Sequence, residues 1–229
     1  MENNLNVLYE DNHVIVVLKP QNVPTQEDES KDLDMLTMVK DYIKEKYEKP
    51  GNVYVGLVHR LDRPTGGVMV FAKTSKAAAR LSEQVKNKEM IKRYLAVTSK
   101  VPAKEQGKLS NYLLKNPKTN TVSVVPQLTT GAKLAELEYK VLDSVNGMSL
   151  VDVNLFTGRS HQIRVQFKHI GCPLVGDAKY GTATANKKLA LWAYYLRFTH
   201  PTTGKTLTFK VFPPADEKPW DNYNYSKLI

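Results

Sequence analysis

The stretch from Val53 to Lys73 most constrains the fold of this chain, because it joins two β-rich runs through a corner of turn residues. The first run ends in His59-Arg60-Leu61-Asp62, and the corner that follows holds a proline, a threonine and two glycines. Turn residues between two such runs predict strands that meet at a tight turn. Side chains alternate along a strand, so Arg60 and Asp62 are expected side by side at the strand end.

This pairing of charges has two interpretations. A carboxylate beside a guanidinium, next to a glycine corner that a ligand can approach closely, is an arrangement that supports chemistry. A surface ion pair at a strand end explains the same pattern, because structural ion pairs also bring opposite charges together. The pattern of residues leaves both interpretations open.

The overall charge indicates a polyanionic partner. Lys and Arg number 33 against 23 Asp and Glu, which gives a formal net charge of +10. Such an excess favours nucleic acid first and an acidic membrane surface second. The length of 229 residues is enough for one substantial domain, or for a cleft between two lobes of one sheet system.

Cysteine usage and hydropathy bear on the compartment. The single cysteine, Cys172, excludes an intrachain disulfide and fits a reducing compartment. No apolar run approaches the length that spans a bilayer, and the first residues lack the basic and apolar regions of a signal peptide. We therefore expect a soluble cytoplasmic protein with no membrane partner.

Hydrophobic periodicity predicts strands interspersed with helices. A strand over 14–18 should end at Lys19-Pro20, because proline cannot continue a hydrogen-bonded ladder. Amphipathic helices are expected over 33–47 and after a cap at Thr74 or Ser75. Further strands are expected over 91–98, 135–143, 149–156, 189–198 and 206–212, with a hairpin turn at Asn146-Gly147.

A short helix is expected from His161 to His169, capped by Ser160 and closed by Gly171. Its apolar residues recur at helical spacing, and a second face carries basic side chains that include Arg164 and Lys168. On pattern alone, a basic face of this kind is usually solvated.

Two other segments leave alternatives open. Residues 101–131 are polar and lysine-rich, which fits either a mobile insertion that touches RNA or a long surface hairpin. The aromatic side chains of the tail, Trp220, Tyr223 and Tyr225, could stack on nucleic-acid bases. Docking of the terminus onto the body of the protein is the favoured interpretation.

Five motifs, in order along the chain, resemble those of the RluA-type pseudouridine synthases. They are Lys19-Pro20 after a strand, His59-Arg60-Leu61-Asp62 with Thr65 and Gly67, Lys92-Arg93-Tyr94, the run from Thr157 to Arg164, and the run from Gly176 to Gly181. The resemblance extends from about Val7 to Pro214. The sequence departs from the family pattern at Asn22, where glycine is usual, and at Cys172 and Trp192, where histidine is common.

The resemblance implies an α+β fold with a mainly antiparallel, mixed sheet in two sublobes and flanking helices. It implies a single catalytic domain over residues 1–229, with a core of about 7–214 and a C-terminal tail over 215–229. Some family members carry a small N-terminal RNA-binding domain, which this chain is expected to lack. RNA contacts are then expected from the catalytic domain itself.

The resemblance also implies the activity, which is conversion of a specific uridine in ribosomal or transfer RNA to pseudouridine. Asp62 would be the nucleophile, Tyr94 would lie against the target uracil, and Arg164 would pair with Asp62. Six further residues are expected to contact the substrate: Arg60, His59, Thr65, Lys19, Arg159 and His161. The reaction needs no cofactor, nucleotide or metal. RNA is the expected partner, and the enzyme is expected to be a monomer.

Two rival functions fit these residues less well. A noncatalytic RNA-binding protein on the same fold should have lost Asp62, Tyr94 or Arg164, and all three are present. A nuclease would need clustered acidic metal ligands, which the sequence does not show. No common zinc-ligand spacing and no dinucleotide-binding glycine motif appears either.

Overall fold

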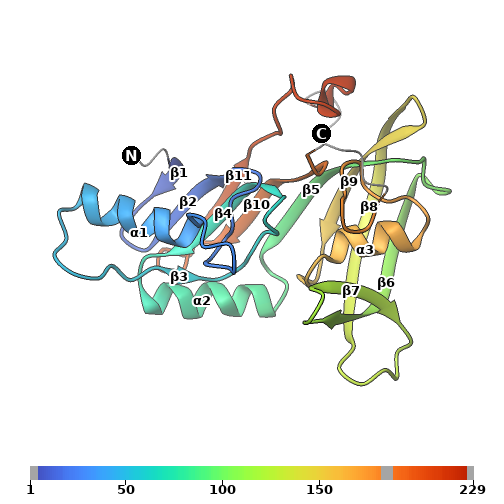
Figure 1. Ribbon diagram of the computed structural model, residues 1–229. Coiled ribbons are helices and arrows are strands. Elements are labelled where there is room, and N and C mark those ends of the chain that lie inside the picture. The colour runs from blue at the N-terminus through green and yellow to red at the C-terminus, as the bar shows by residue number, and fades with distance from the viewer. Residues whose placement is uncertain (1–4, 182–187, 226–229) are drawn as a thin grey trace. The chain divides into compact units, whose positions relative to one another are not determined.

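The computed structural model describes residues 5–181 and 188–225. The chain divides into two compact units (Figure 1). The first unit comprises Met1–Ile91 and Tyr195–Val211, and the second comprises Lys92–Tyr194 and Phe212–Ile229. The expected α+β class with a mainly antiparallel sheet is confirmed by the strand pairings.

The strands β1, β2, β4 and β10 follow one another in that order, with β3 paired to β4 and β11 paired to β10; of β10, Tyr195–Thr199 belong to the first unit. Their bounds are Asn6–Glu10 for β1, Val14–Lys19 for β2, Gly56–Leu57 for β3, Gly66–Ala72 for β4, Leu191–Thr199 for β10 and Thr206–Lys210 for β11. Every residue of β4 is buried. A continuous apolar run such as β4 is typical of a strand that is covered on both faces.

Two capped helices complete the first unit. Helix α1 (Met35–Lys46) begins at Asp34, whose carboxylate accepts from the N–H groups of Leu36 and Thr37. Helix α2 (Ser75–Lys86) begins at Thr74, which confirms the expected cap. Such caps satisfy N–H groups that have no partner inside the helix.

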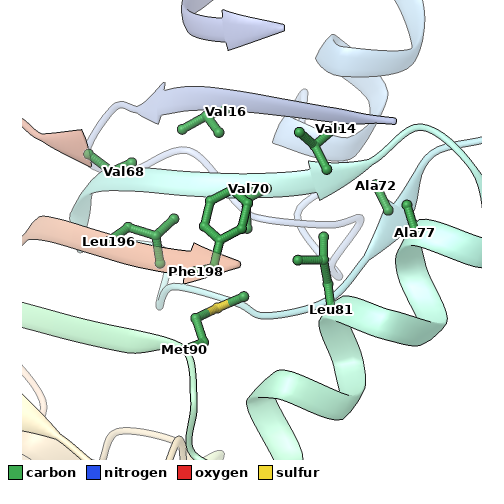
Figure 2. Packing of buried hydrophobic residues seen from close by; sticks show 10 residues of the cluster. All are labelled: Val14, Val16, Val68, Val70, Ala72, Ala77, Leu81, Met90, Leu196 and Phe198. Carbon is green, nitrogen blue, oxygen red and sulfur yellow. The ribbon is translucent and has the colours of Figure 1, made fainter. Parts of the chain in front are cut away.

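Helix α2 buries its apolar face in a hydrophobic cluster with β2, β4 and β10. Figure 2 shows Leu81 of α2 pointing toward valines of β2 and β4 and toward Phe198 of β10. Leu81, Val70 and Ala72 are fully buried. The cluster therefore fixes α2 against β4, the strand that follows the Pro/Gly corner.

The strands of the second unit include β5, β9, β8, β6 and β7 in that order. Their bounds are Ile91–Thr98 for β5, Met148–Leu155 for β9, Lys133–Val145 for β8, Gln106–Asn116 for β6 and Thr121–Val125 for β7. The expected hairpin turn is confirmed, because Asn146 and Gly147 take the positive φ values of 51° and 75°. Residues 106–125 form a second hairpin, so the hairpin interpretation of the lysine-rich segment is correct.

The C-terminal segment packs onto the second unit as expected. Trp220, Tyr223 and Tyr225 expose 2%, 6% and 4% of their surfaces. The hydroxyl of Tyr225 donates to the carbonyl of Pro213 at 2.6 Å. These rings are therefore packing groups in this structure and present no face for a base to stack on.

The prediction of a long strand before the Pro/Gly corner is wrong, because the strand has only two residues. Only Gly56–Leu57 pair with β4, and the chain then leaves the sheet. At the next position along β4, the N–H of Val70 donates to the His59 ring at 3.1 Å instead of to a strand carbonyl. Arg60 and Asp62 therefore lie on a loop, and the strand alternation that was expected to align them does not apply.

Within residues 5–181 and 188–225, no helix is long and apolar enough to cross a membrane.

Leu81→Ala should lower the free energy of unfolding by about 2–5 kcal/mol, because it leaves a cavity in a fully packed cluster. Urea denaturation of the variant measures this loss. Lys76→Ala, on the exposed side of the same helix, is the matched control and should change stability by less than about 0.5 kcal/mol. An equal effect of the two substitutions would contradict the packing role of Leu81.

Candidate active site

The loop that carries Asp62 is tied by its backbone to the segment that follows β2. The carbonyl of Leu61 accepts from the Thr25 hydroxyl at 2.8 Å, and the carbonyl of Pro64 accepts from Gln21 at 2.9 Å. The N–H of Asn22 donates to the carbonyl of Arg63 at 2.8 Å. Irregular backbone needs such partners because it lacks those of a helix or sheet.

The amine of Lys19 makes the central connection to this loop. It donates to the carbonyls of Pro20, Arg63 and Thr65 at 2.9, 3.0 and 2.7 Å. The side chain is fully buried. Three acceptors match the three hydrogens of a protonated amine. Lys19 thus holds the loop in shape, and its expected contact with substrate stays a prediction.

The charge of Lys19 is coupled to that of Asp62. Burial lowers the pKa of Lys19 to about 7, the negative charge of Asp62 acts to raise it, and Arg63 acts to lower it. An opposite charge favours the protonated amine, whereas burial disfavours it. Asp62 therefore helps to maintain the cation that shapes its own loop.

Asn22 preserves the corner after β2, although the family pattern has glycine at that position. Its φ is 65°, in the left-handed region that asparagine tolerates better than most residues. The expectation that the corner survives this departure is confirmed. The N–H of Asn22 is thereby directed at the Asp62 loop.

The expected substrate-binding residues of the first unit differ in exposure. Arg60 is exposed and Asp62 is half-buried, so both are within reach of a ligand. Thr65 exposes 2% of its surface, and the His59 ring accepts from the backbone of β4. Contacts of Thr65 and His59 with substrate stay predictions, and their packing points to a role in shaping the loop.

The Arg63 side chain is held by an acidic segment, residues 28–32. It forms ion pairs with Asp32 and, at 3.6 Å, with Asp28, and it donates to the Ser30 hydroxyl at 2.8 Å. These groups are largely exposed, so each pair contributes little to stability. Together they keep the Arg63 side chain engaged with residues 28–32.

The second unit contains a buried ion pair between Arg164 and Asp177. The guanidinium donates twice, from Nε at 2.9 Å and from a terminal nitrogen at 2.7 Å. The two side chains expose 6% and 0% of their surfaces. The solvated basic face that the helical pattern alone suggests does not hold at Arg164, because a two-point carboxylate contact provides a buried partner for its charge.

Asp177 stays ionised inside the protein. Burial acts to raise its pKa, but Arg164 and the N–H groups of Tyr180 and Lys179 outweigh burial and hold the pKa below its usual value. Both N–H groups donate to Oδ1 at 3.0 Å. The pairing expected between Arg164 and Asp62 joins residues of the two units and stays a prediction.

His161 and Tyr180 connect this ion pair to the lysine-rich hairpin. The Tyr180 hydroxyl lies 2.6 Å from Nδ1 of His161 and accepts from the N–H of Val122 in β7 at 2.8 Å. The Arg164 guanidinium lies 5.1 Å from the centre of the Tyr180 ring. His161 is thus built into a packed cluster, and its contact with substrate stays a prediction.

Helix α3 (Gln162–His169) begins differently from expectation. His161 takes a left-handed conformation at φ 52°, and no side chain caps the helix. The predicted Ser160 cap is therefore wrong. Instead, Gln162 accepts from the Thr157 hydroxyl at 2.8 Å and from the N–H of Arg159 at 3.0 Å, which shapes the corner before the helix.

Arg159 and Tyr94 complete the expected residues of the second unit. Arg159 is exposed, and its Nε donates to the carbonyl of Leu134 at 3.0 Å. Tyr94 exposes 6% of its surface on β5, opposite Val153 of β9. The substrate contacts expected of both residues stay predictions.

Sequence reasoning missed the supporting residues Gln162, Asp177 and Tyr180. The signal for Asp177 and Tyr180 was their place in a matched motif, but the motif does not reveal their hydrogen-bond partners. Gln162 lies between His161 and Arg164, which the sequence did indicate, and its residue type alone is ordinary for a helix. Across the described ranges 5–181 and 188–225, no group of three or more His, Cys, Asp or Glu residues could hold a metal ion.

Comparison with known proteins identifies the family. Residues 13–169 match the family of RNA pseudouridylate synthases. The chain belongs to this family. Its fold resembles that of human RNA pseudouridylate synthase domain containing 4, with a TM-score of 0.77 and 23% identity over 91% of this chain and 88% of that one.

Two bacterial members of the RNA pseudouridylate synthase family are closer in sequence. The chain is 34% identical to ribosomal large subunit pseudouridine synthase C of Rickettsia bellii, over 90% of this chain and 64% of that protein. It is 33% identical to the uncharacterized RNA pseudouridine synthase YlyB of Bacillus subtilis, over 93% and 70%. The chain thus spans about two thirds of the length of these curated relatives.

Lys19→Met should weaken the loop that carries Asp62. Three carbonyls lose their shared donor, and we expect the free energy of unfolding to fall by about 2–4 kcal/mol. Hydrogen exchange at the N–H of Thr65, which donates to the Asp62 carbonyl at 2.9 Å, should accelerate. The exposed Lys31→Met serves as control. Unchanged exchange at Thr65 in Lys19→Met would rule out the holding role of Lys19.

Arg164→Met and Asp177→Asn should each destabilise the second unit by about 3–5 kcal/mol, because each removes one member of a buried pair. Chemical denaturation of both variants and of the double variant gives a coupling energy. We expect the double variant to lose about 1–3 kcal/mol less than the sum of the single losses. Strict additivity would show that the two side chains do not depend on each other.

Proposed function

We propose that this chain converts a uridine of structured RNA to pseudouridine, with Asp62 as the nucleophile. The observation that carries the proposal is the family match over residues 13–169, which includes Asp62, Tyr94 and Arg164. The half-buried Asp62 side chain, on a loop held by a buried cation, supports the same assignment. A noncatalytic RNA-binding protein has no need for this carboxylate.

The proposed reaction breaks the bond between N1 of uracil and the sugar, turns the base and rejoins it through C5. C5 loses a proton and N1 gains one, so the atoms balance without a redox step. The carboxylate of Asp62 would attack either the sugar or the ring. Arg164 would keep that carboxylate ionised and aimed, and Tyr94 would stack on the uracil and accept the C5 proton.

Access to the base requires that the target uridine leave its stack, which costs about a few kcal/mol. The exposed Arg60 is suited to fill the vacated space and to contact nearby phosphates. The net charge of +10 supports further phosphate contacts over the surface. Lys19, Thr65 and His59 would act indirectly, by holding the loop between β3 and β4.

Ribosomal RNA is the favoured substrate, because several curated relatives are named as synthases of the large ribosomal subunit. A transfer-RNA uridine is the second candidate. Site-by-site pseudouridine mapping of RNA from cells with and without this gene tests the choice. Loss of a modification from large-subunit RNA supports the first candidate, and loss from transfer RNA alone rejects it.

Asp62→Asn should abolish isomerisation and preserve RNA binding. Asparagine is nearly isosteric with aspartate and leaves in place the backbone carbonyls that accept from Lys19, so the loop should keep its path although one charge that favours the Lys19 cation is lost together with the charge needed for attack. The measurement is tritium release from RNA labelled at uracil C5, run beside a filter-binding titration.

The exposed Glu27→Gln variant is the control for Asp62→Asn and should behave like wild type in both assays. Tritium release by Asp62→Asn at the wild-type rate would exclude Asp62 as the nucleophile. Absence of release from every RNA with wild-type protein would reject the proposed activity itself.

A further inference from the structure

Lys92, in the second unit, is a lysine whose side chain is buried. It exposes 9% of its surface. Within residues 5–181 and 188–225, its amine takes part in no hydrogen bond or ion pair. Burial alone lowers its pKa, and no carboxylate contributes to the shift.

The other buried cations of the described chain have partners, which makes Lys92 unusual. Lys19 donates to three carbonyls, Lys73 pairs with Glu10, and Arg164 pairs with Asp177. An ammonium group removed from water without such partners costs several kcal/mol. The Lys92 amine is not among the fully buried unpaired atoms of the described chain, so it keeps some contact with solvent, but no described residue compensates for the partial burial that lowers its pKa.

Strand geometry places the Lys92 amine beside the corner that precedes α3. Strands β5 and β9 run antiparallel with Arg93 opposite Asn154, so Lys92 lies near the end of β9, where the chain turns into Thr157-Gly158-Arg159. A Cβ atom built on Gly158 would lie 3.8 Å from Nζ of Lys92 and would meet no other atom within 4 Å.

The space beside Gly158 therefore lets a ligand come close to the amine of Lys92. The Gly158 backbone is exposed, and the missing side chain leaves space next to the amine. Any larger residue at position 158 would fill that space. Alternation along β5 also places Lys92 on the same face as Tyr94, the residue proposed to stack on the uracil.

We propose that Lys92 and the open corner at Gly158 form an anion-binding subsite that takes a phosphodiester group of the RNA. A phosphodiester offsets the full charge of the ammonium, whereas a neutral base carbonyl leaves most of it uncompensated. The identity of the anion as RNA rests on the proposed function. The existence of an anion subsite rests on the burial of Lys92 and the approach at Gly158.

The test is binding of a fluorescein-labelled ten-nucleotide oligouridylate, followed by fluorescence anisotropy across a salt series. Lys92→Met should raise Kd about tenfold at low salt. The slope of log K against log salt should decrease by about 0.7, the value for one phosphate contact on a single strand. The exposed Lys140→Met removes the same charge from β8 and should leave Kd within about twofold.

Two further measurements separate a ligand site from a structural lysine. Lys92→Met should unfold at a higher temperature than wild type, because it removes an unpaired buried charge. Gly158→Leu keeps the amine but fills the approach to it, and it should weaken binding as Lys92→Met does. Its backbone has no positive φ to strain the new side chain.

An unchanged Kd in both variants would overturn the subsite, as would weaker binding with an unchanged salt slope. Wild-type protein that binds through Lys92 but releases no tritium from any RNA would reject the isomerisation and keep the subsite. Active wild-type protein with normal binding by Lys92→Met would reject the subsite and keep the isomerisation. Each proposal, the isomerisation and the anion subsite, can therefore be rejected while the other one stands.

Discussion

The hydrogen bonds of the Lys19 amine are the constraint on which the loop of Asp62 depends. Its three carbonyl acceptors come from Pro20, beside it, and from Arg63 and Thr65, more than forty residues away. A neutral side chain of similar length would leave all three without this donor. Because burial lowers the pKa of Lys19 to about 7 while Asp62 acts to raise it, the loop and the charge that it carries support each other.

Two buried cations, Lys19 in the first unit and Arg164 in the second, are stabilised in different ways. The first unit surrounds the Lys19 ammonium with backbone carbonyls, which fixes the path of an irregular loop. The second unit matches the planar guanidinium of Arg164 to the carboxylate of Asp177, which fixes a helix against the turn over residues 176–181. An amine is suited to three scattered acceptors and a guanidinium to one planar partner. If lysine and arginine were exchanged between positions 19 and 164, N–H hydrogens would lack acceptors at both positions.

Regular elements could be predicted because their signals are local. Apolar runs and periodicity identified β4, β5 and α2, and Asn146-Gly147 identified its hairpin turn. The path of residues 58–65 could not be predicted, because it is set by side chains such as Thr25 and Lys19 from distant parts of the chain. The Ser160 cap failed for a related reason. Gln162 reaches back to the corner before the helix, and no sequence rule anticipates that contact.

The motif residues themselves divide into those that hold the protein together and those whose side chains a substrate can reach. The first group includes Thr65, His59 and Asp177. Their side chains are buried or bonded to other parts of the protein, so their place in a motif reflects packing. Arg60 and Asp62 lie on the same loop but remain within reach of solvent. Sequence patterns record both groups alike, because a motif gives residue types and not their contacts. Burial and hydrogen-bond partners separate them, and this separation directs attention to Asp62 for chemistry and to Lys92 for binding.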